Sequence, residues 1–238
     1  MQSVRFLDAG EQALVVEFGD GIDPALNAMV HAFDAALQEA AIPGLQETLP
    51  TYRSVLVHFD PATIDRVALR ARLRELAGLA ASGRFHPARR WLVPVAYGGA
   101  AGMDLDDVAR ALELSTAEVV RLHAGAEYVV YMLGFSPGFP YLGGLPQRLH
   151  LTRRAEPRLR TPARSVIIGG QQAAILPGEM PSGWHVLGRT PVHSFDLRRA
   201  EPFLFRPGDL LRFEPVSEAE LARLEARTDW LPPVERLA

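Results

Sequence analysis

The 238-residue chain contains no cysteine. Disulfide bonds, thiolate ligands for zinc or iron–sulfur clusters, and a cysteine nucleophile are therefore excluded. Lysine is absent as well, and all 25 basic residues are arginine. Without lysine the chain has no Walker A phosphate loop, no Schiff base for pyridoxal phosphate and no attachment point for biotin. If ATP is used, its phosphates must be held by arginine, by backbone amides or by another subunit.

Long apolar runs are missing too. No stretch near the start has the length of a signal peptide, and no run elsewhere has the length of a membrane span. The net charge of -3 gives no reason to expect nucleic acid or an anionic membrane as a partner. The seven histidines lack the His-x-His and His-Glu-x-x-His spacings, so no metal site is predicted. We therefore expect a cytoplasmic protein.

Residues 1–80 predict a small α+β domain. Its strands are expected at residues 3–7, 12–18, 45–49 and 54–59. Asp23 and Pro24 predict the start of a helix after the second strand, and Thr63 is expected to cap another helix after the fourth. The order β-β-α-β-β-α predicts an antiparallel sheet covered on one face by two helices. Residues 81–90 show no periodic pattern and are assigned as a linker.

Residues 91–238 predict a mainly-β domain, because short strands alternate with turns rich in Gly and Pro. This pattern is typical of a closed barrel or a sandwich. Strands are expected at residues 91–97, 128–132, 165–169, 172–176, 184–188, 192–195 and 209–213. Short helices are expected at residues 105–112, 116–123 and 218–227. Ser115 and Ser217 begin capping boxes for the last two helices. His123 is expected to interact with a helix dipole, and the alternative is a polar group near the Gly/Pro-rich segment that starts at residue 133.

The most distinctive segment is Leu133–Pro146, which contains four glycines, three prolines, two phenylalanines and a tyrosine. This composition disfavours a regular helix or a central strand and predicts a shaped loop. Such a loop either lines a ligand site with its aromatic side chains or packs them into the core. Its Gly-x-Ser-x-Gly match is not a hydrolase elbow, because Pro137 lacks the N–H that serves there as an oxyanion donor.

A cluster of arginines follows this loop. Proline residues keep it extended, and guanidinium groups suit carboxylates and phosphates. At least one of its members is expected to contact an anionic substrate or a partner, while the others form a solvated or subunit-facing strip. The cluster comprises Arg153, Arg154, Arg158, Arg160 and Arg164. The loop at 133–146 and the arginine cluster could converge at one end of the barrel and form a concave site there. The Gly/Pro-rich turns at 179–184 and 187–191 would complete this site.

Several motifs together resemble the PxpB/KipI family, whose members are also described as the B subunit of 5-oxoprolinase, as allophanate hydrolase subunit 1 or as carboxyltransferase subdomain A. The motifs are Gly134–Pro146, Pro157-Arg158, Gly169–Gln171, Pro181–Trp184, Gly188–Pro191 and Pro207–Asp209. The resemblance covers nearly the whole chain. It implies a small α+β domain followed by a cyclophilin-like β-barrel, which agrees with domains at 1–80 and 91–238.

The resemblance further implies a subunit of an ATP-dependent enzyme that opens 5-oxo-L-proline to L-glutamate. Its partners would be a homologous PxpC-type subunit and a PxpA-type subunit. Two alternatives stay open: a component of a urea carboxylase or allophanate hydrolase system beside a biotin-carrying partner, and a non-enzymatic regulator resembling histidine-kinase inhibitors. No catalytic residue is assigned. The candidate substrate- or nucleotide-binding residues are Phe135, Pro137, Gly138, Phe139, Tyr141, Arg153, Arg158, Gln171, Trp184, Arg189 and Thr190.

Three positions depart from the family pattern. The resemblance implies glycine where Arg164 stands, tyrosine in place of Leu176, and glycine in place of Ser182. An arginine in place of glycine could fill or recharge a pocket. The substrate is therefore less firmly implied than the family.

Overall fold

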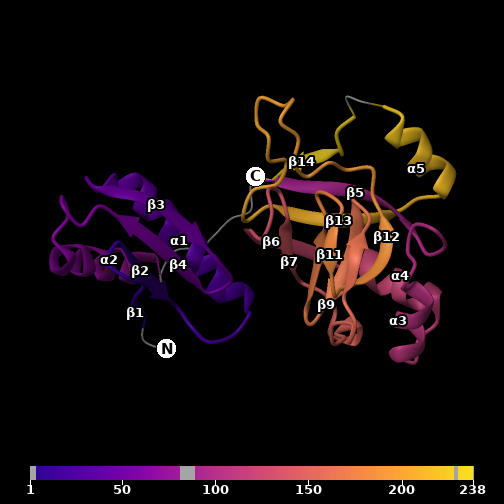
Figure 1. Cartoon of the computed structure of the whole chain (residues 1–238), viewed down its shortest axis with the longest axis horizontal. Coiled ribbons are helices and arrows are strands. Elements are labelled where there is room, and N and C mark those ends of the chain that lie inside the picture. Colours follow the sequence, from indigo (N-terminus) through magenta and orange to yellow (C-terminus); the bar gives the residue numbers. More distant parts are fainter. Residues whose placement is uncertain (1–3, 81–88, 228–229, 238) are drawn as a thin grey trace. The chain divides into compact units, whose positions relative to one another are not determined.

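The computed structural model describes residues 4–80, 89–227 and 230–237. The chain divides into two compact units, Met1–His86 and Pro87–Ala238 (Figure 1). Most of the predicted linker lies outside the described residues, so its extent stays a prediction. Within the described residues, no helix combines the length and the apolar character that crossing a membrane requires.

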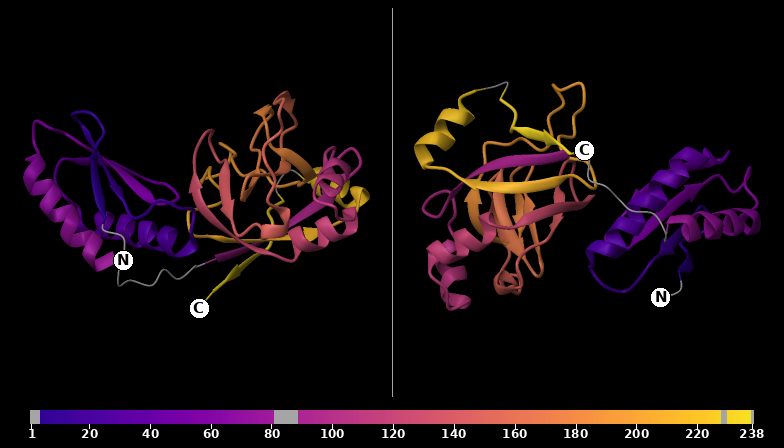
Figure 2. Two further views of the ribbon diagram at one scale, coloured as in Figure 1. Left: turned by 90° about the horizontal axis from the view of Figure 1, so that it is seen from below. Right: turned by 180° about the vertical axis from the view of Figure 1, so that it is seen from behind.

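The first unit is an antiparallel sheet with strand order β1-β2-β4-β3, and both helices cover the same face of it (Figure 2). Side chains such as Leu14, Phe33, Val57 and Leu73 form the core between sheet and helices. The elements are β1 (Arg5–Asp8), β2 (Ala13–Glu17), α1 (Pro24–Ala40), β3 (Leu45–Pro50), β4 (Ser54–Phe59) and α2 (Arg66–Ala80). The predicted α+β architecture is confirmed, including the cap of α1 by Asp23.

The predicted cap of the second helix is wrong. Helix α2 begins at Arg66, and the Asp65 carboxylate accepts a hydrogen bond from the N–H of Ala68 at 2.7 Å. The Thr63 hydroxyl instead donates to the carbonyl of Asp60 at 3.2 Å. The chain completes a turn after β4 before the helix starts, so the cap moves two residues along the sequence.

The second unit is a closed barrel of seven strands, in which β12-β9-β10-β7-β6-β13-β5 follow one another and β5 pairs again with β12. Among the described strands of this barrel, β5 and β13 form the one parallel pair. The elements begin with β5 (Arg89–Tyr97), α3 (Leu105–Ala111), α4 (Thr116–Ala124), β6 (Glu127–Leu133), β7 (Pro140–Gly143), the 3₁₀ turn η1 (Gln147–Leu149) and β8 (Arg158–Thr161). They continue with β9 (Ser165–Gly169), β10 (Gln172–Ile175), β11 (Met180–Ser182), β12 (His185–Arg189), β13 (Leu210–Pro215), α5 (Glu218–Glu225) and β14 (Val234–Arg236). The predicted mainly-β barrel is confirmed.

Part of the segment predicted as a loop is a central strand. Strand β7 lies between β6 and β10 in the barrel wall, and the loop itself covers only the residues between β6 and β7. Pro140 is the first residue of the strand, where a missing N–H is tolerated. A Cβ atom at Gly143 would lie 2.0 Å from the ring of Tyr131, so glycine is required there by packing. The Gly- and Pro-rich composition of the segment indicated a loop and gave no sign of this strand.

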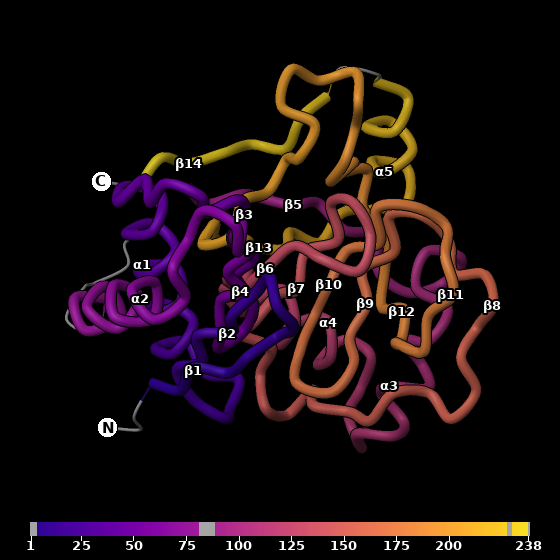
Figure 3. Tube along the Cα trace, turned by 60° about the vertical axis from the view of Figure 1, so that its left-hand side comes forward, coloured from indigo at the N-terminus to yellow at the C-terminus, as the bar shows by residue number. Residues whose placement is uncertain are grey.

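The strand predicted at 192–195 does not form. Phe195 makes a single β-bridge with Phe203, and the N–H of Val192 donates to the hydroxyl of Thr190 at 3.3 Å. The Thr190 hydroxyl thus accepts a backbone hydrogen bond that a neighbouring strand would otherwise accept. Strands β8 and β11 pair with each other outside the barrel, beside β12 (Figure 3).

His123 lies in the barrel core and is not a charged partner of a helix dipole. Its Nδ1 is 2.8 Å from the Tyr97 hydroxyl, and its ring stacks on Phe213 with centroids 4.7 Å apart. Burial lowers the pKa of His123 to about 3, so the imidazole is neutral. Burial raises the pKa of Tyr97, so the phenol keeps its proton and donates it to the imidazole.

This buried imidazole predicts a stability that depends on pH. Below an ordinary pKa of 6.5 the unfolded chain binds a proton at His123 that the folded chain does not bind until about pH 3. The stability that the folded state gains from keeping His123 neutral is therefore fully present above pH 6.5. It is lost as the pH falls, by at most about 1.4 kcal/mol per pH unit. Urea unfolding between about pH 7 and 4.5 should show a shallower pH slope for His123→Gln than for the natural chain. An unchanged slope in His123→Gln would contradict the assignment of a neutral, buried imidazole.

Candidate functional site

The outer face of the barrel carries its own apolar row. Val186, Ile167, Ala174 and Tyr141 lie opposite one another across β12, β9, β10 and β7. Alternate residues of a strand point to opposite faces, so their neighbours along each strand fill the barrel interior. With Phe139, Leu176 and Trp184, the outward row forms a second apolar cluster. The barrel wall therefore provides the floor for a site on its outside.

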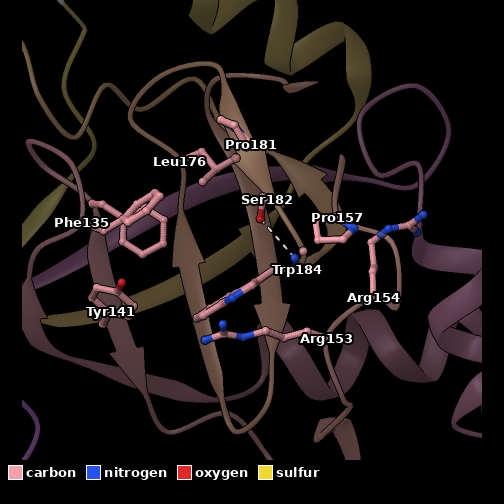
Figure 4. A pocket seen from close by; sticks show the side chains of 11 residues that line it. Phe135, Tyr141, Arg153, Arg154, Pro157, Leu176, Pro181, Ser182 and Trp184 are labelled. Atoms are coloured by element: carbon pink, nitrogen blue, oxygen red, sulfur yellow. Dashed lines mark hydrogen bonds between the residues drawn. The ribbon is translucent and has the colours of Figure 1, made fainter. Parts of the chain in front are cut away.

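A pocket of about 260 Å³ lies over this floor (Figure 4). Three segments meet there: the loop between β6 and β7, the stretch between η1 and β8, and the turn around β11. The lining residues are Phe135, Phe139, Tyr141, Arg153, Arg154, Pro157, Leu176, Pro181, Ser182, Gly183 and Trp184. Of the segments expected to converge at one end of the barrel, the loop, the arginine stretch and the turn at 179–184 meet on its outer wall, whereas the turn at 187–191 does not line the pocket.

Trp184 is the largest wall of the pocket. A Cβ atom at Gly169 would lie 2.8 Å from the indole ring, so this glycine lets the ring lie flat against β9. The Ser182 hydroxyl accepts a hydrogen bond from the backbone N–H of Trp184 at 3.1 Å, and this bond fixes the turn between β11 and β12 (Figure 4). The rings of Phe139 and Tyr141 each lie 6.3 Å from the indole ring. Together these rings form the apolar side of the pocket.

Arg153 supplies the positive charge of the pocket. Its guanidinium carbon lies 5.6 Å from the centroid of the Trp184 ring, an arrangement that orders the side chain by a cation–π contact (Figure 4). Within the parts of the chain that the structure describes, no carboxylate lies within ion-pair distance of it. A charge that is ordered but not neutralised is suited to binding an anion.

Each of the other four arginines of the cluster contacts a carboxylate of the chain itself. Arg160 pairs with Glu179 at 3.0 Å, and Arg164 pairs with Glu225 at 3.2 Å. Arg154 and Arg158 both contact the carboxylate of Asp104. Arg153 is thus the arginine of the cluster that has no carboxylate partner among the described residues, and the contact of an arginine with an anionic substrate or a partner stays a prediction.

Asp104 is fully buried and holds the arginine segment against the barrel. It accepts hydrogen bonds from Arg158 at 2.6 Å, from Arg154 at 3.0 Å and from the N–H of Val186 at 2.7 Å. Burial alone would raise the pKa of this carboxyl. The hydrogen bonds from Arg158 and Val186 and the charges of both arginines outweigh burial and lower the pKa. The carboxylate is therefore ionised and fixes Arg154 at the pocket rim.

Tyr141 contributes a hydroxyl group that stays protonated. Burial raises its pKa, and the charge of Arg153 offsets only part of this effect. A protonated phenol is uncharged, so Tyr141 places no negative charge beside Arg153. Among the described residues, no group of three or more His, Asp or Glu side chains is placed to hold a metal ion.

The candidate residues from the sequence fall into two groups. Those that line the pocket are Phe135, Phe139, Tyr141, Arg153 and Trp184. The remaining candidates lie elsewhere: Pro137 and Gly138 line an adjoining groove, Arg158 contacts Asp104, Gln171 is exposed, Arg189 pairs with Glu225, and Thr190 is buried. Their proposed binding roles stay predictions.

Sequence reasoning missed Asp104 and six lining residues. Pro181, Ser182 and Gly183 belong to the Gly/Pro-rich turn at 179–184, which the sequence already assigns to the concave site, so a signal for them is present. Asp104 directly precedes α3 and has the sequence position of a helix cap, yet its side chain makes no cap hydrogen bond. Nothing local distinguishes it from an ordinary capping aspartate.

Two of the three departures from the family pattern, Leu176 and Ser182, line the pocket, and Arg164 does not. Arg164 has a backbone φ of 64°, a left-handed conformation that explains why glycine is implied at this position. Its guanidinium points to Glu225 on α5 and does not fill the pocket. The substitutions able to alter the bound ligand are therefore those at 176 and 182.

The comparisons place this architecture in a class. Residues 4–205 match the family described as "Carboxyltransferase domain, subdomain C and D", whereas the resemblance names subdomain A. The protein is thus of the carboxyltransferase-domain class. The 5-oxoprolinase B subunit of Escherichia coli O157:H7 is 42% identical over 92% of this chain and 99% of its own length. The protein of the same name from Bacillus subtilis is 37% identical over 89% of this chain and 92% of its own length. The chain belongs to the PxpB family, the B subunits of 5-oxoprolinase.

A solved structure, that of TTHA0988, superimposes with a TM-score of 0.77 at 36% sequence identity. The match covers 87% of this chain but only 40% of TTHA0988. In that protein the same fold therefore forms part of a longer polypeptide.

Proposed function

We propose that the chain is the PxpB subunit of an ATP-dependent 5-oxoprolinase, and that the pocket on the outer barrel wall binds 5-oxo-L-proline. The complex, cytoplasmic in this proposal, would also contain PxpC-type and PxpA-type subunits and would open the lactam to L-glutamate. Two curated relatives that match most of this chain carry the name of that enzyme's B subunit. This favours 5-oxoprolinase over the urea carboxylase-type and regulator alternatives.

The observation that carries the proposal is that Arg153 lies beside a cluster of aromatic rings and, among the described residues, has no carboxylate partner. 5-Oxoproline is a small, nearly flat ring with one carboxylate. Arg153 would hold the carboxylate, and the rings of Trp184, Phe139 and Tyr141 would contact the lactam ring.

The same pocket is poorly suited to ATP. A triphosphate carries several negative charges, and the described residues of the pocket offer one cation that is not already paired. We therefore assign the phosphates of ATP to another subunit.

The chemistry requires no nucleophilic side chain. The γ-phosphoryl group of ATP would pass to the lactam oxygen, releasing ADP, and water would then add to the activated ring carbon. The carbon–nitrogen bond breaks, the nitrogen leaves as the amine, and a second water hydrolyses the resulting acyl phosphate to glutamate and phosphate. In this sequence the chain positions the ring and excludes bulk water from it.

Reconstitution tests the proposal. ATP hydrolysis should be measured with and without 5-oxoproline, for the purified chain alone and then with the PxpC-type and PxpA-type subunits. We expect stimulation by 5-oxoproline only when all subunits are present. A fully assembled mixture that 5-oxoproline does not stimulate would rule out the 5-oxoprolinase assignment.

A further inference from the structure

A second cavity, of about 50 Å³, lies between the loop that joins β12 to β13 and the segment that leads into β14 (Figure 1). The loop contributes His193, Asp196 and Arg199 to its lining, and the other segment contributes Trp230. Among the described residues, it shares no lining residue with the pocket around Trp184. A water molecule needs about 10–15 Å³ of such space, and a cofactor-sized ligand needs roughly 300–1,000 Å³. The cavity therefore has room for a small ion and excludes a nucleotide.

Arg199 lines this cavity and has two buried nitrogen atoms without an acceptor. Its backbone N–H donates to the carbonyl of Asp196 at 3.2 Å, and its Nη2 donates to the carbonyl of His193 at 2.6 Å. These two bonds fix the side chain in place. Its Nε and Nη1 atoms are buried and, among the described residues, have no hydrogen-bond partner. Buried donors are nearly always satisfied in folded proteins, so these two nitrogen atoms require an acceptor from outside the described chain.

The carboxylate that lines the cavity is already paired with another arginine. Arg198 donates to Asp196 through its side chain, to Oδ1 at 3.0 Å and to Oδ2 at 2.6 Å, and through its backbone N–H to Oδ1 at 3.0 Å. These hydrogen bonds lower the pKa of Asp196, so the carboxylate is ionised. Within the described parts of the chain, Arg199 has no carboxylate at ion-pair distance. The charge of Asp196 is thus matched by Arg198, and that of Arg199 is left over.

The surroundings of the cavity are positively charged. Burial is the main reason why the pKa of His193 is lowered, and the nearby charge of Arg164 lowers it further. Arg198 and Arg199 act in the same direction, whereas Asp196 opposes them. Three cations thus outweigh one carboxylate at this imidazole, and such a field favours an anion.

We propose that this cavity is a binding site for a small oxyanion of the phosphate type, an inference that does not depend on the proposed function. Such an ion offers several oxygen acceptors at once, which suits a guanidinium group with two free nitrogen atoms. The ion would contact both the loop after β12 and the segment before β14, because both line the cavity. Its binding would therefore hold these two parts of the second unit together.

The test is a titration of the purified chain with inorganic phosphate at constant ionic strength, followed by calorimetry. We expect one saturable site in the natural chain. Arg199→Gln should weaken phosphate binding roughly 10-fold or more, because charge-assisted hydrogen bonds are lost, and Arg199→Lys should recover part of the affinity. Arg206→Gln is the matched control, since Arg206 lies on the same loop and pairs with Glu201 at 2.6 Å. Circular dichroism establishes that each variant folds.

Tryptophan fluorescence gives a second measurement that leaves Arg199 unchanged. Trp230 lines the cavity, and Trp184 lines the substrate pocket. A change in emission on addition of phosphate should therefore persist in Trp184→Phe and disappear in Trp230→Phe. A change that disappears in Trp184→Phe instead would place the phosphate in the substrate pocket and overturn the proposal.

The titration has further outcomes that would overturn the proposal. Equal phosphate affinities of the natural chain and Arg199→Gln would do so, and an absence of saturable binding to the natural chain would mean that water alone satisfies Arg199. Loss of binding in Arg153→Ala but not in Arg199→Gln would again assign the phosphate to the substrate pocket. If acetate binds as tightly as phosphate and with the same dependence on Arg199, the site takes carboxylates and the phosphate-type assignment is wrong. Stimulation of ATP hydrolysis by 5-oxoproline is measured separately, so the proposed function stands or falls on its own.

Discussion

Arg153→Ala is expected to raise the KM for 5-oxoproline roughly 10- to 100-fold in the reconstituted enzyme, which is the effect of losing a charge-assisted hydrogen bond of about 1.5–3 kcal/mol. The structure gives the reason. Arg153 is ordered by the ring of Trp184, and no carboxylate of the described residues neutralises it. A substrate carboxylate would take that place. Arg153→Lys should recover part of the loss, since it keeps the charge but loses the two-pronged geometry.

The control for this prediction is Arg160→Ala. Arg160 belongs to the same cluster, but its side chain is 83% exposed and pairs with Glu179 outside the pocket. Its removal should leave the KM for 5-oxoproline within about twofold, as expected for a surface ion pair. The measurement is the 5-oxoproline dependence of ATP hydrolysis by the full complex. Equal effects of the two substitutions would show that net charge matters and that the pocket does not hold the carboxylate.

The parts of the fold that local signals specify were predictable from sequence. Asp23 and Pro24 start α1 where their cap and first-turn preferences indicate, and Ser115 caps α4 through the N–H of Glu118. These interactions join residues only a few positions apart. The barrel strands with continuous apolar runs were predictable for a related reason, because both of their faces are buried.

Strand β7 was not predictable in this way. Its proline and two neighbouring glycines indicate a turn when the segment is considered alone. The fit of Gly143 against Tyr131, and the pairing with β6 and β10, depend on residues that become neighbours only in the closed barrel. Tertiary packing overrides local propensity here.

The residues of the candidate site were likewise only partly predictable from the sequence. The sequence identified a cluster of five arginines but could not distinguish the one without a carboxylate partner from the four that have one. Those partners, Asp104, Glu179 and Glu225, come from separate parts of the second unit. Which guanidinium has no carboxylate partner depends on contacts that form only in the folded chain. The composition of the cluster therefore predicted an anion site, but not which arginine would bind the anion.

Asp104→Asn is expected to lower the free energy of unfolding of the barrel by about 3–5 kcal/mol, the cost of removing one partner from a buried ion pair. The substitution keeps the shape of the side chain but leaves Arg154 and Arg158 without their negative charge. It also weakens the hydrogen bond that the carboxylate accepts from the N–H of Val186 on β12. Asp107→Asn is the matched control on α3, because Asp107 makes an exposed ion pair with Arg110. Its substitution should change the urea midpoint very little.

The pH dependence of stability distinguishes a loss of charge at Asp104 from a general defect of packing. The folded pKa of Asp104 is lowered, so its contribution is present above the ordinary carboxyl pKa and is lost as pH falls through the lower folded value. The natural chain should therefore have a larger free energy of unfolding than Asp104→Asn at neutral pH. The difference between the two free energies should become smaller in acid. A difference that is the same at neutral pH and in acid would contradict the ionised carboxylate. Because Arg154 lines the pocket and Asp104 holds it, the loss of this charge should also loosen the site, raising the KM for 5-oxoproline without removing any group that contacts the substrate.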